Sequence, residues 1–478
     1  MLFTEFDFWI FFPIVMLGLW CNRTLIGSLK IQNYLLLISS YIFYGYWDWR
    51  FLILIIFCTL QTYYLAGAMS DKEDSKFRNT RLLWISVLLN LAILGYFKYA
   101  NFFYAEAANL FKQFGYAGST STLNILLPVG ISFYIFQSLT YIIDVYRGQL
   151  KKEPSLVNYA TYIAFFPQLV AGPIERAANL LPQFTSLRQV TEKQIYQGVR
   201  LIIFGLFLKV VIADSLAAVV DDIFAWYENF NGGVHALGAI YFAVQIYGDF
   251  CGYSMIAIGA ANCMGFRLMT NFDTPYFSCS IQEFWRRWHI SLSSFFRDYL
   301  YIPLGGSRVS EAKILRNLIL AATISGLWHG ANWTFIVWGF LHGVLLVIQR
   351  KLNQYLSIPE SITKQGITGF LFKISSWALT FSLVALLLVV FRSETVLDAF
   401  VYIKEIFFHF KMPDYHVKSL SFVFMMFVGD WILLKNNRLE KNITNSKVLD
   451  YLVFTILTLL TIDAFVVNNS RDFIYFQF

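Results

Sequence analysis

Apolar residues along this chain come in long runs that short polar segments separate. A helix crosses a bilayer core about 30 Å thick with roughly 20 mostly apolar residues, and many of the runs approach that length. The pattern therefore predicts an all-α, polytopic membrane protein with about eleven transmembrane helices plus re-entrant or interfacial helices. The candidate runs are residues 8–21, 33–47, 51–68, 82–98, 124–146, 156–171, 195–220, 235–264, 314–328, 333–350, 368–392, 419–434 and 448–467.

One stretch departs from this pattern. Residues 160–182 contain Pro167, Pro173 and Pro182, which predict a bent or re-entrant segment. Irregular backbone is tolerated at membrane depth where protein or a water-filled cavity surrounds it. No fixed-period repeat or long linker divides the sequence. We therefore predict one membrane domain over residues 1–478, with a motif-bearing core at about 120–350 and C-terminal helices at 366–478.

The composition excludes several classes of protein. Of the 478 residues, 57% are hydrophobic and 14% are charged, whereas soluble chains have about 45–50% apolar and about 25% charged residues. The five cysteines lie in or beside apolar runs without a CxxC pair, so neither a disulfide framework nor a metal site is favoured. The net charge of +7 comes from scattered basic residues. Membrane lipid is therefore the expected surrounding, and nucleic acid is not an expected partner.

Basic residues in alternate loops indicate an orientation. Arg23, Arg78 and Arg147 belong to basic loops that follow the first, third and fifth runs. The positive-inside rule places these loops in the cytoplasm and the N-terminus outside. Glu5 and Asp7 stand where a signal peptide would carry positive charge, so we expect no cleaved leader.

His329 is the most unusual ionisable residue. It lies in Gly326-Leu327-Trp328-His329-Gly330, where one apolar run ends and another begins. An ionisable group at membrane depth is costly and suggests a functional site that faces a wet cavity; the alternative is a hydrogen bond that joins two helices. The two glycines leave room for a ligand or for another helix. If the segment is helical, Asn332 lies on the same face and can orient the imidazole.

His289 lies in a second aromatic and basic stretch, Phe284–Ser293. On a continuous helix, Arg286, His289 and Ser293 share one side. A functional histidine and an interfacial anchor are both open interpretations, because Arg and Trp are common at membrane surfaces.

Asp249 lies inside the apolar run 235–264. A buried carboxylate needs a partner or stays protonated, so Asp249 either belongs to a proton relay or pairs with an arginine and fixes the packing. His342, His409 and His416 have no supporting neighbours in the sequence, and we expect them to be structural or exposed. No serine-hydrolase elbow, HExxH motif, Walker loop or GxGxxG motif occurs in a usable context. A histidine general base is the chemistry that remains, since imidazole takes up a proton near neutral pH.

Several motifs occur in a fixed order through about residues 1–350. They are Tyr44–Arg50, Leu127–Tyr134, Phe166–Glu175, Phe284–Gly306 and Gly326–Trp333. Together they resemble the membrane-bound O-acyltransferase family, specifically its bacterial branch with alginate O-acetyltransferase, peptidoglycan O-acetyltransferase and the teichoic-acid D-alanyl transfer protein. The last third of the chain agrees with that family only in hydropathy.

The resemblance implies a fold and a site. The family fold is a ring of tilted helices around a thin centre, where a funnel or tunnel lets a cytoplasmic acyl thioester meet an acceptor from the other side. The histidine of the Trp-His-Gly motif is the family's catalytic residue, which here is His329 beside Trp328. The histidine of the Arg-Arg-Trp-His motif is the second functional position, here His289. A frequent partner in the family is an extracytoplasmic SGNH-hydrolase-like protein that passes acetyl to a polysaccharide.

We therefore expect an O-acetyltransferase in the bacterial cytoplasmic membrane. It takes acetyl from acetyl-CoA, which is a substrate, and no cofactor is permanently bound. His329 removes the proton of the attacking hydroxyl, and His289 orients the donor or supports the proton path. Arg286, Arg287 and Arg297 are candidates for binding the phosphates of coenzyme A, with lipid anchoring as the alternative.

Two other functions stay open at this point. D-alanyl transfer to teichoic acid takes its thioester from a carrier protein instead of coenzyme A. A proton-coupled transporter would use His329 and Asp249 as a relay, although the inverted repeats common in transporters are not visible in the sequence. The acceptor polysaccharide cannot be read from the chain, and a covalent acetyl-histidine is a variant of the mechanism.

Overall fold

The computed structural model describes residues 1–70, 75–115, 125–170, 172–355, 366–435, 446–467, 471 and 473–474. Regular structure in these residues is helical, which confirms the all-α prediction. They form two compact units, of which unit 1 is Met1–Val199 with Ile256–Met269, and unit 2 is Arg200–Met255 with Thr270–Phe478. The expected single domain over residues 1–478 stays a prediction.

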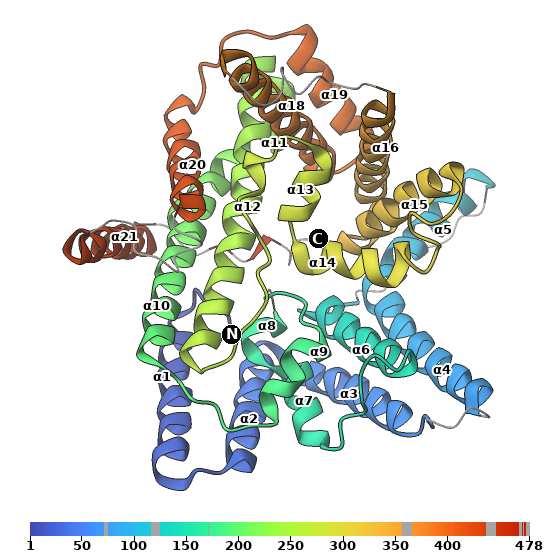
Figure 1. Ribbon diagram of the computed structural model, residues 1–478. Coiled ribbons are helices and arrows are strands. Elements are labelled where there is room, and N and C mark those ends of the chain that lie inside the picture. The colour runs from blue at the N-terminus through green and yellow to red at the C-terminus, as the bar shows by residue number, and fades with distance from the viewer. Residues whose placement is uncertain are drawn as a thin grey trace. The chain divides into compact units, whose positions relative to one another are not determined.

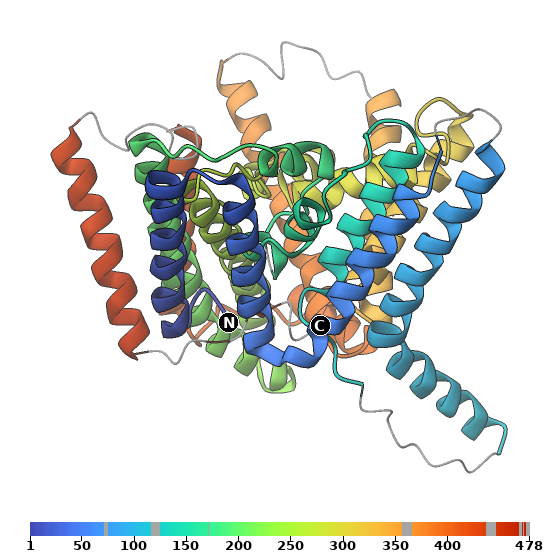
Figure 2. The same ribbon diagram turned by 90° about the horizontal axis from the view of Figure 1, so that it is seen from below.

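Unit 1 is built from the helices of the first apolar runs (Figure 1, blue to green). Within it α6 packs on α3 and α4, and α7 packs on α2 and α3. Figure 2 shows α2 and α3 as the two arms of a V that is joined at residues 49–51. The elements are α1 (Phe6–Cys21), α2 (Leu29–Asp48), α3 (Leu52–Gly67), α4 (Lys76–Leu94), α5 (Ala100–Gln113), α6 (Ile131–Tyr146), α7 (Leu156–Ala164), α8 (Phe166–Leu169), α9 (Ala177–Leu180) and the start of α10 (Glu192–Leu206).

The proline-containing segment of unit 1 is broken, as predicted. Instead of one long helix, it forms α7, α8, α9 and a 3-10 turn at Leu181–Phe184. Side chains from α2 satisfy part of this irregular backbone, because Asn33 Nδ2 donates to Phe184 O at 2.7 Å. Ser40 Oγ likewise accepts from Phe166 N at 3.1 Å. Such internal partners allow a broken segment to be buried.

Unit 2 carries both candidate histidines. The rest of α10 leads through a π-helical turn at Phe207–Ala213 into α11. The elements that follow are α11 (Asp214–Ala225), α12 (Gly232–Cys263, which ends in unit 1), α13 (Ile281–Arg287), α14 (Ile290–Phe296), α15 (Glu311–His329), α16 (Trp333–Tyr355), α18 (Gly366–Arg392), α19 (Val396–Phe408), α20 (Leu420–Lys435) and α21 (Lys447–Val467).

Eight helical stretches in the described residues are long and apolar enough to cross a membrane. This supports the prediction of a multi-pass membrane protein, while the count of about eleven is not confirmed. The predicted runs 235–264 and 314–328 are helical as α12 and α15, but neither is among the eight. The stretches are Phe6–Ile26, Leu29–Gly67, Lys76–Gln113, Glu192–Ala225, Trp333–Tyr355, Gly366–Arg392, Val417–Leu434 and Lys447–Val466.

Helices α15 and α16 form a hairpin whose backbones touch (Figure 1, yellow and brown). A Cβ atom at Gly326 would lie 2.2 Å from Phe335 O, and one at Gly339 would lie 2.4 Å from Ala322 O. Only glycine permits this approach, which is the small-residue packing common between membrane helices. Of the two uses expected for the glycine at 326, room for another helix is the one observed.

Ion pairs join the two helices at the far end of the same hairpin. Glu311, at the start of α15, pairs with Arg350 at 3.0 Å and with Lys351 at 3.2 Å. Hydrogen bonds from Arg350 are the main reason that the pKa of Glu311 falls to about 2. The carboxylate therefore stays ionised at physiological pH, and the two helices are tied at both ends of their contact.

Replacing Gly339 by Ala should destabilise the protein, because the added methyl group has no space beside the α15 backbone. Overpacking of this kind costs about 1–3 kcal/mol, so the thermal midpoint of the detergent-purified protein should fall. Gly95→Ala is the matched control, since nothing lies within 4 Å of a Cβ at that position. Equal thermal midpoints for the two variants would contradict the backbone contact.

Candidate functional site

Helix α15 ends at His329, because Gly330 takes an extended conformation with φ −164° and ψ 161°. The imidazole is 3% exposed. The rings of Trp338 and Phe391 meet it edge-on, with centroid distances of 5.1 and 5.5 Å. The described side chains around His329 thus include an aromatic wall made by Trp338 and Phe391.

The predicted helical continuation from His329 to Asn332 is wrong. Since the helix stops at His329, Asn332 does not share its face and instead caps the start of α16. Its Oδ1 accepts from Thr334 N at 3.1 Å, and its Nδ2 donates to Glu394 O at 3.0 Å. Both polar atoms of the Asn332 side chain are therefore used in hydrogen bonds that link the start of α16 to the segment after α18.

The continuous helix predicted through His289 is also wrong. Helix α13 ends at Arg287, α14 begins at Ile290, and His289 between them has a left-handed φ of 41°. Tertiary hydrogen bonding holds this break, because Ile290 N donates to Asn271 O at 2.8 Å. Arg286, His289 and Ser293 consequently do not share one helix face.

The environment of His289 fixes its tautomer. Its Nδ1 lies 3.0 Å from Asn271 Oδ1. That oxygen also accepts from Ser291 Oγ at 2.8 Å, while Asn271 Nδ2 donates to Ser254 Oγ at 3.2 Å. An amide oxygen can only accept, so Nδ1 of His289 carries the hydrogen and Nε2 carries the lone pair.

This histidine is kept neutral. His289 is completely buried, and burial lowers its pKa to about 3, because removal from water disfavours the charged imidazolium. Its Nε2 is buried without a hydrogen-bond partner among the described residues. The lone pair of His289 Nε2 is thus not used by a hydrogen bond within the described residues.

A row of rings connects the two predicted histidines. Trp328 lies 5.9 Å from His289 and 5.0 Å from His329, measured between ring centroids. On the other side of His329, the ring of Trp338 lies 4.8 Å from that of His342. We call these five residues the ring row. It brings His289, His329 and Trp328 together in unit 2.

His342 is the member that sequence reasoning missed. Contrary to the expectation that it has no supporting neighbours, its side chain contacts both Trp338 and Trp285. Its burial agrees with the structural one of the two expected alternatives, structural or exposed. The available signal was its spacing, since His342 lies one helical turn after Trp338 on α16.

The three arginines proposed for phosphate binding differ in availability. Arg287 pairs with Glu283 at 2.9 Å, and Arg297 pairs with Asp298 at 2.6 Å. Arg286 is exposed and has no ion pair among the described residues. An incoming anion would therefore compete with a carboxylate at two of the positions and with water at the third.

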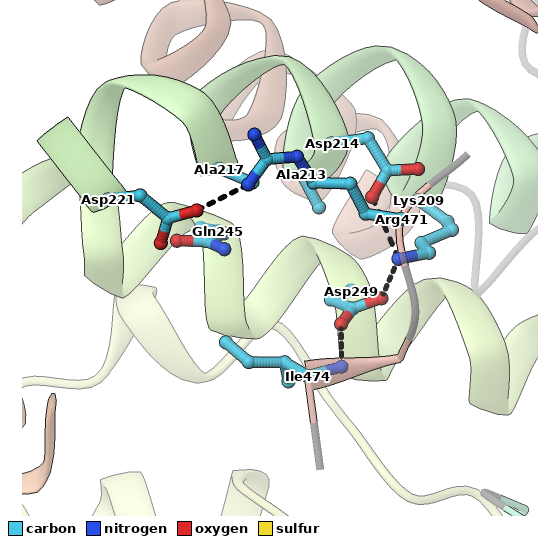
Figure 3. A pocket seen from close by; sticks show the side chains of 9 residues that line it. All are labelled: Lys209, Ala213, Asp214, Ala217, Asp221, Gln245, Asp249, Arg471 and Ile474. Carbon is cyan, nitrogen blue, oxygen red and sulfur yellow. Dashed lines mark hydrogen bonds and ion pairs between the residues drawn. The ribbon is translucent and has the colours of Figure 1, made fainter. Parts of the chain in front are cut away.

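Asp249 has a lysine partner instead of the predicted arginine. Its Oδ1 lies 2.8 Å from Lys209 Nζ. Both side chains line the small pocket drawn in Figure 3, together with Asp214 and Asp221. No group of three His, Cys, Asp or Glu side chains that could hold a metal ion occurs within the described residues.

Comparison with known proteins assigns this arrangement to a family. The sequence profile described as "MBOAT, membrane-bound O-acyltransferase family" matches residues 43–391, a stretch that contains the whole ring row. The chain belongs to the membrane-bound O-acyltransferase family. It is therefore a membrane-embedded acyltransferase and not a transporter.

Named relatives within the family act on different surface polymers. A probable alginate O-acetylase of Pseudomonas putida is 40% identical over 440 residues, which are 92% of this chain and 83% of the relative. A peptidoglycan O-acetyltransferase of Helicobacter pylori is 32% identical over 420 residues, 81% of this chain and 76% of the relative. A teichoic acid D-alanyltransferase of Streptococcus thermophilus is 31% identical over 265 residues, but these are 52% of this chain and 63% of the relative.

Replacing Asn271 by Ala should lower kcat by about tenfold or more, because the tautomer of a histidine in acid–base chemistry is set by the partner of its other nitrogen. Asn271→Asp keeps an acceptor for Nδ1 and should retain more activity. Asn179→Ala, at an exposed position of α9, is the control. Equal activity of the Ala and Asp variants at position 271 would argue against this role.

Proposed function

We propose that this acyltransferase moves an acetyl group from cytoplasmic acetyl-CoA to a hydroxyl group on the other side of a bacterial cytoplasmic membrane. The acceptor hydroxyl belongs to a cell-surface polysaccharide or to an SGNH-hydrolase-like partner that relays the acetyl group. Relatives named as O-acetylases or O-acetyltransferases cover most of the chain, which supports acetyl as the group. The basic loops support an outside N-terminus.

The position of His329 at the end of α15 is the observation that carries the proposal. Unpaired carbonyl groups give a helix C-terminus a partial negative charge, which favours a cation there by about 0.3–1 kcal/mol. His329 is the last residue of α15, and the indole of Trp338 lies beside it. An imidazolium formed there is stabilised by the helix end.

The proposed reaction follows from this preference. The hydroxyl oxygen attacks the thioester carbonyl carbon while its proton passes to His329. The tetrahedral intermediate then releases coenzyme A as a thiolate, which takes the proton from the imidazolium. General-base catalysis of this kind contributes about 10²–10⁴-fold. An acetyl-histidine intermediate is a variant of the same scheme.

A role in the proton path suits His289 better than a role in orienting the acyl donor. Its free Nε2 can only accept a hydrogen bond, whereas a thioester carbonyl needs a donor. His289 Nε2 can therefore accept the hydrogen bond of the acceptor hydroxyl before that proton passes to His329. Trp328, which is buried between the two imidazoles, keeps water away and so protects the thioester from hydrolysis.

D-alanyl transfer is the second candidate. The D-alanyltransferase relative supports it, but that similarity covers about half of this chain. Incubation of the purified protein with labelled acetyl-CoA, or with a D-alanyl carrier protein, separates the two donors. We expect the labelled acetyl group of acetyl-CoA to be transferred to the acceptor, and the labelled D-alanyl group to remain on the carrier protein.

Replacing His329 by Ala should abolish O-acetylation of envelope glycans, with at least about a hundredfold loss because the general base is gone. The measurement is mass spectrometry of glycan acetate esters in a deletion strain that carries each variant. His409→Ala, with a side chain 62% exposed, is the matched control. The assignment is wrong if His329→Ala protein of normal membrane abundance still acetylates.

Replacing Arg286 by Gln should raise the KM for acetyl-CoA severalfold, because its guanidinium is the one of the three that no neighbouring carboxylate occupies. Arg297→Gln should have a smaller effect. Arg50→Gln is the control, because Arg50 pairs with Asp48 at 2.6 Å and belongs to a loop expected outside. An unchanged KM in Arg286→Gln would favour lipid anchoring.

A further inference from the structure

A group of buried charges lies between α11 and α12 in unit 2 (Figure 3). Lys209 Nζ lies 2.8 Å from Asp214 Oδ1 and 2.8 Å from Asp249 Oδ1, and all three side chains are at most 4% exposed. One cation thus faces two carboxylates. Charges removed from water in this way need partners, since removing a single partner leaves an uncompensated charge.

A short segment near the end of the chain supplies more partners. We call the described residues Arg471, Phe473 and Ile474 the anchor segment. The backbone N–H of Ile474 donates to Asp249 Oδ2 at 2.6 Å, so Asp249 holds Lys209 with one oxygen and the anchor segment with the other (Figure 3).

Arg471 of the anchor segment also balances the negative charge of the carboxylates in this group. Arg471 pairs with Asp221, which in turn pairs with Arg392 of α18 at 2.9 Å. With Arg471 in place, the group contains three cations and three carboxylates; without it, the carboxylates are in excess. Electrostatic complementarity therefore favours the position of the anchor segment in which Arg471 pairs with Asp221.

Phe473 lies among aromatic rings when the segment is seated. It is completely buried, with its ring centroid 4.6 Å from that of Tyr253 and 5.6 Å from that of Phe250. The ring of Phe250 in turn meets His289 edge-on at 4.6 Å, with an interplanar angle of 88°. Phe250 is thus held between Phe473 and the imidazole.

We propose that the anchor segment is a positioning element for His289, with Phe473 supporting Phe250 against the imidazole and Asp249 holding the segment in place. This role rests on the function proposed above for His289. Asn271 fixes the hydrogen of the imidazole, and Phe250 limits how far the ring can tilt about that hydrogen bond. Asp249 then acts as an anchor and not as a proton relay.

The test compares purified full-length variants at positions 473 and 250. Phe473→Ala should lower kcat for acetyl transfer by about tenfold, because small misplacements of reacting groups are costly, while the KM for acetyl-CoA changes less than twofold. Phe473→Leu, which fills part of the volume, should give an intermediate kcat. Phe408→Ala, on an exposed ring of α19, should behave like the unaltered protein.

A double-mutant cycle tests whether Phe473 acts on His289 through Phe250. If Phe473 acts through Phe250, the double variant Phe250→Ala/Phe473→Ala should have the kcat of the worse single variant, since coupled positions are not additive. Multiplicative losses, or an unchanged kcat in Phe473→Ala, would overturn the proposal. If the Phe473→Ala protein does not accumulate, the test uses Phe473→Leu instead. A kcat of Phe473→Leu equal to that of the unaltered protein would then overturn the proposal.

Arg471→Gln tests the anchor without altering a buried ring, because the Arg471 side chain is 39% exposed. We expect about a threefold fall in kcat, as loss of the ion pair loosens the seating of Phe473. A kcat equal to that of the Arg50→Gln control would count against anchoring. An unaltered protein that transfers no acetyl refutes the proposed function instead, so the two failures are distinguishable.

Discussion

The backbone contact between α15 and α16 is the constraint on which the candidate site depends. Gly326 and Gly339 let the two helices touch without side chains between them. This contact brings Trp338 of α16 beside His329. The part of the ring row that joins α15 to α16, from His329 to Trp338, depends on this close approach.

The acid–base role proposed for the two histidines depends on which of their forms, neutral or charged, the surroundings favour. Desolvation keeps His289 neutral, and one amide oxygen decides which of its nitrogens can accept a hydrogen bond. His329 is also buried, at 3% exposure, but it lies at the C-terminal end of α15, where the helix dipole offsets part of the cost of a positive charge. The two histidines therefore differ in their hydrogen-bond partners and in their position relative to a helix end.

Hydropathy and motifs predicted the helical membrane fold, the break at the prolines and the family. They did not predict where the helices near the histidines end. Both errors, at Asn332 and at His289, came from extending a helix through a residue whose conformation is set by tertiary contacts: Phe335 packs against Gly330, and Asn271 holds the start of α14. His342 was missed although Trp338 lies one turn before it on α16, because its other neighbour, Trp285, comes from α13; Lys209 was missed because it is 40 residues away from Asp249.

The polarity of α15 has a consequence for substrate choice. Any acyl group that reaches His329 approaches the carbonyl end of this helix, where negative charge is disfavoured. A neutral acetyl group, or an aminoacyl group with an ammonium, meets no repulsion there. A dicarboxylic acyl group such as succinyl would carry a carboxylate into the same field, which disfavours it by about 0.3–1 kcal/mol relative to acetyl.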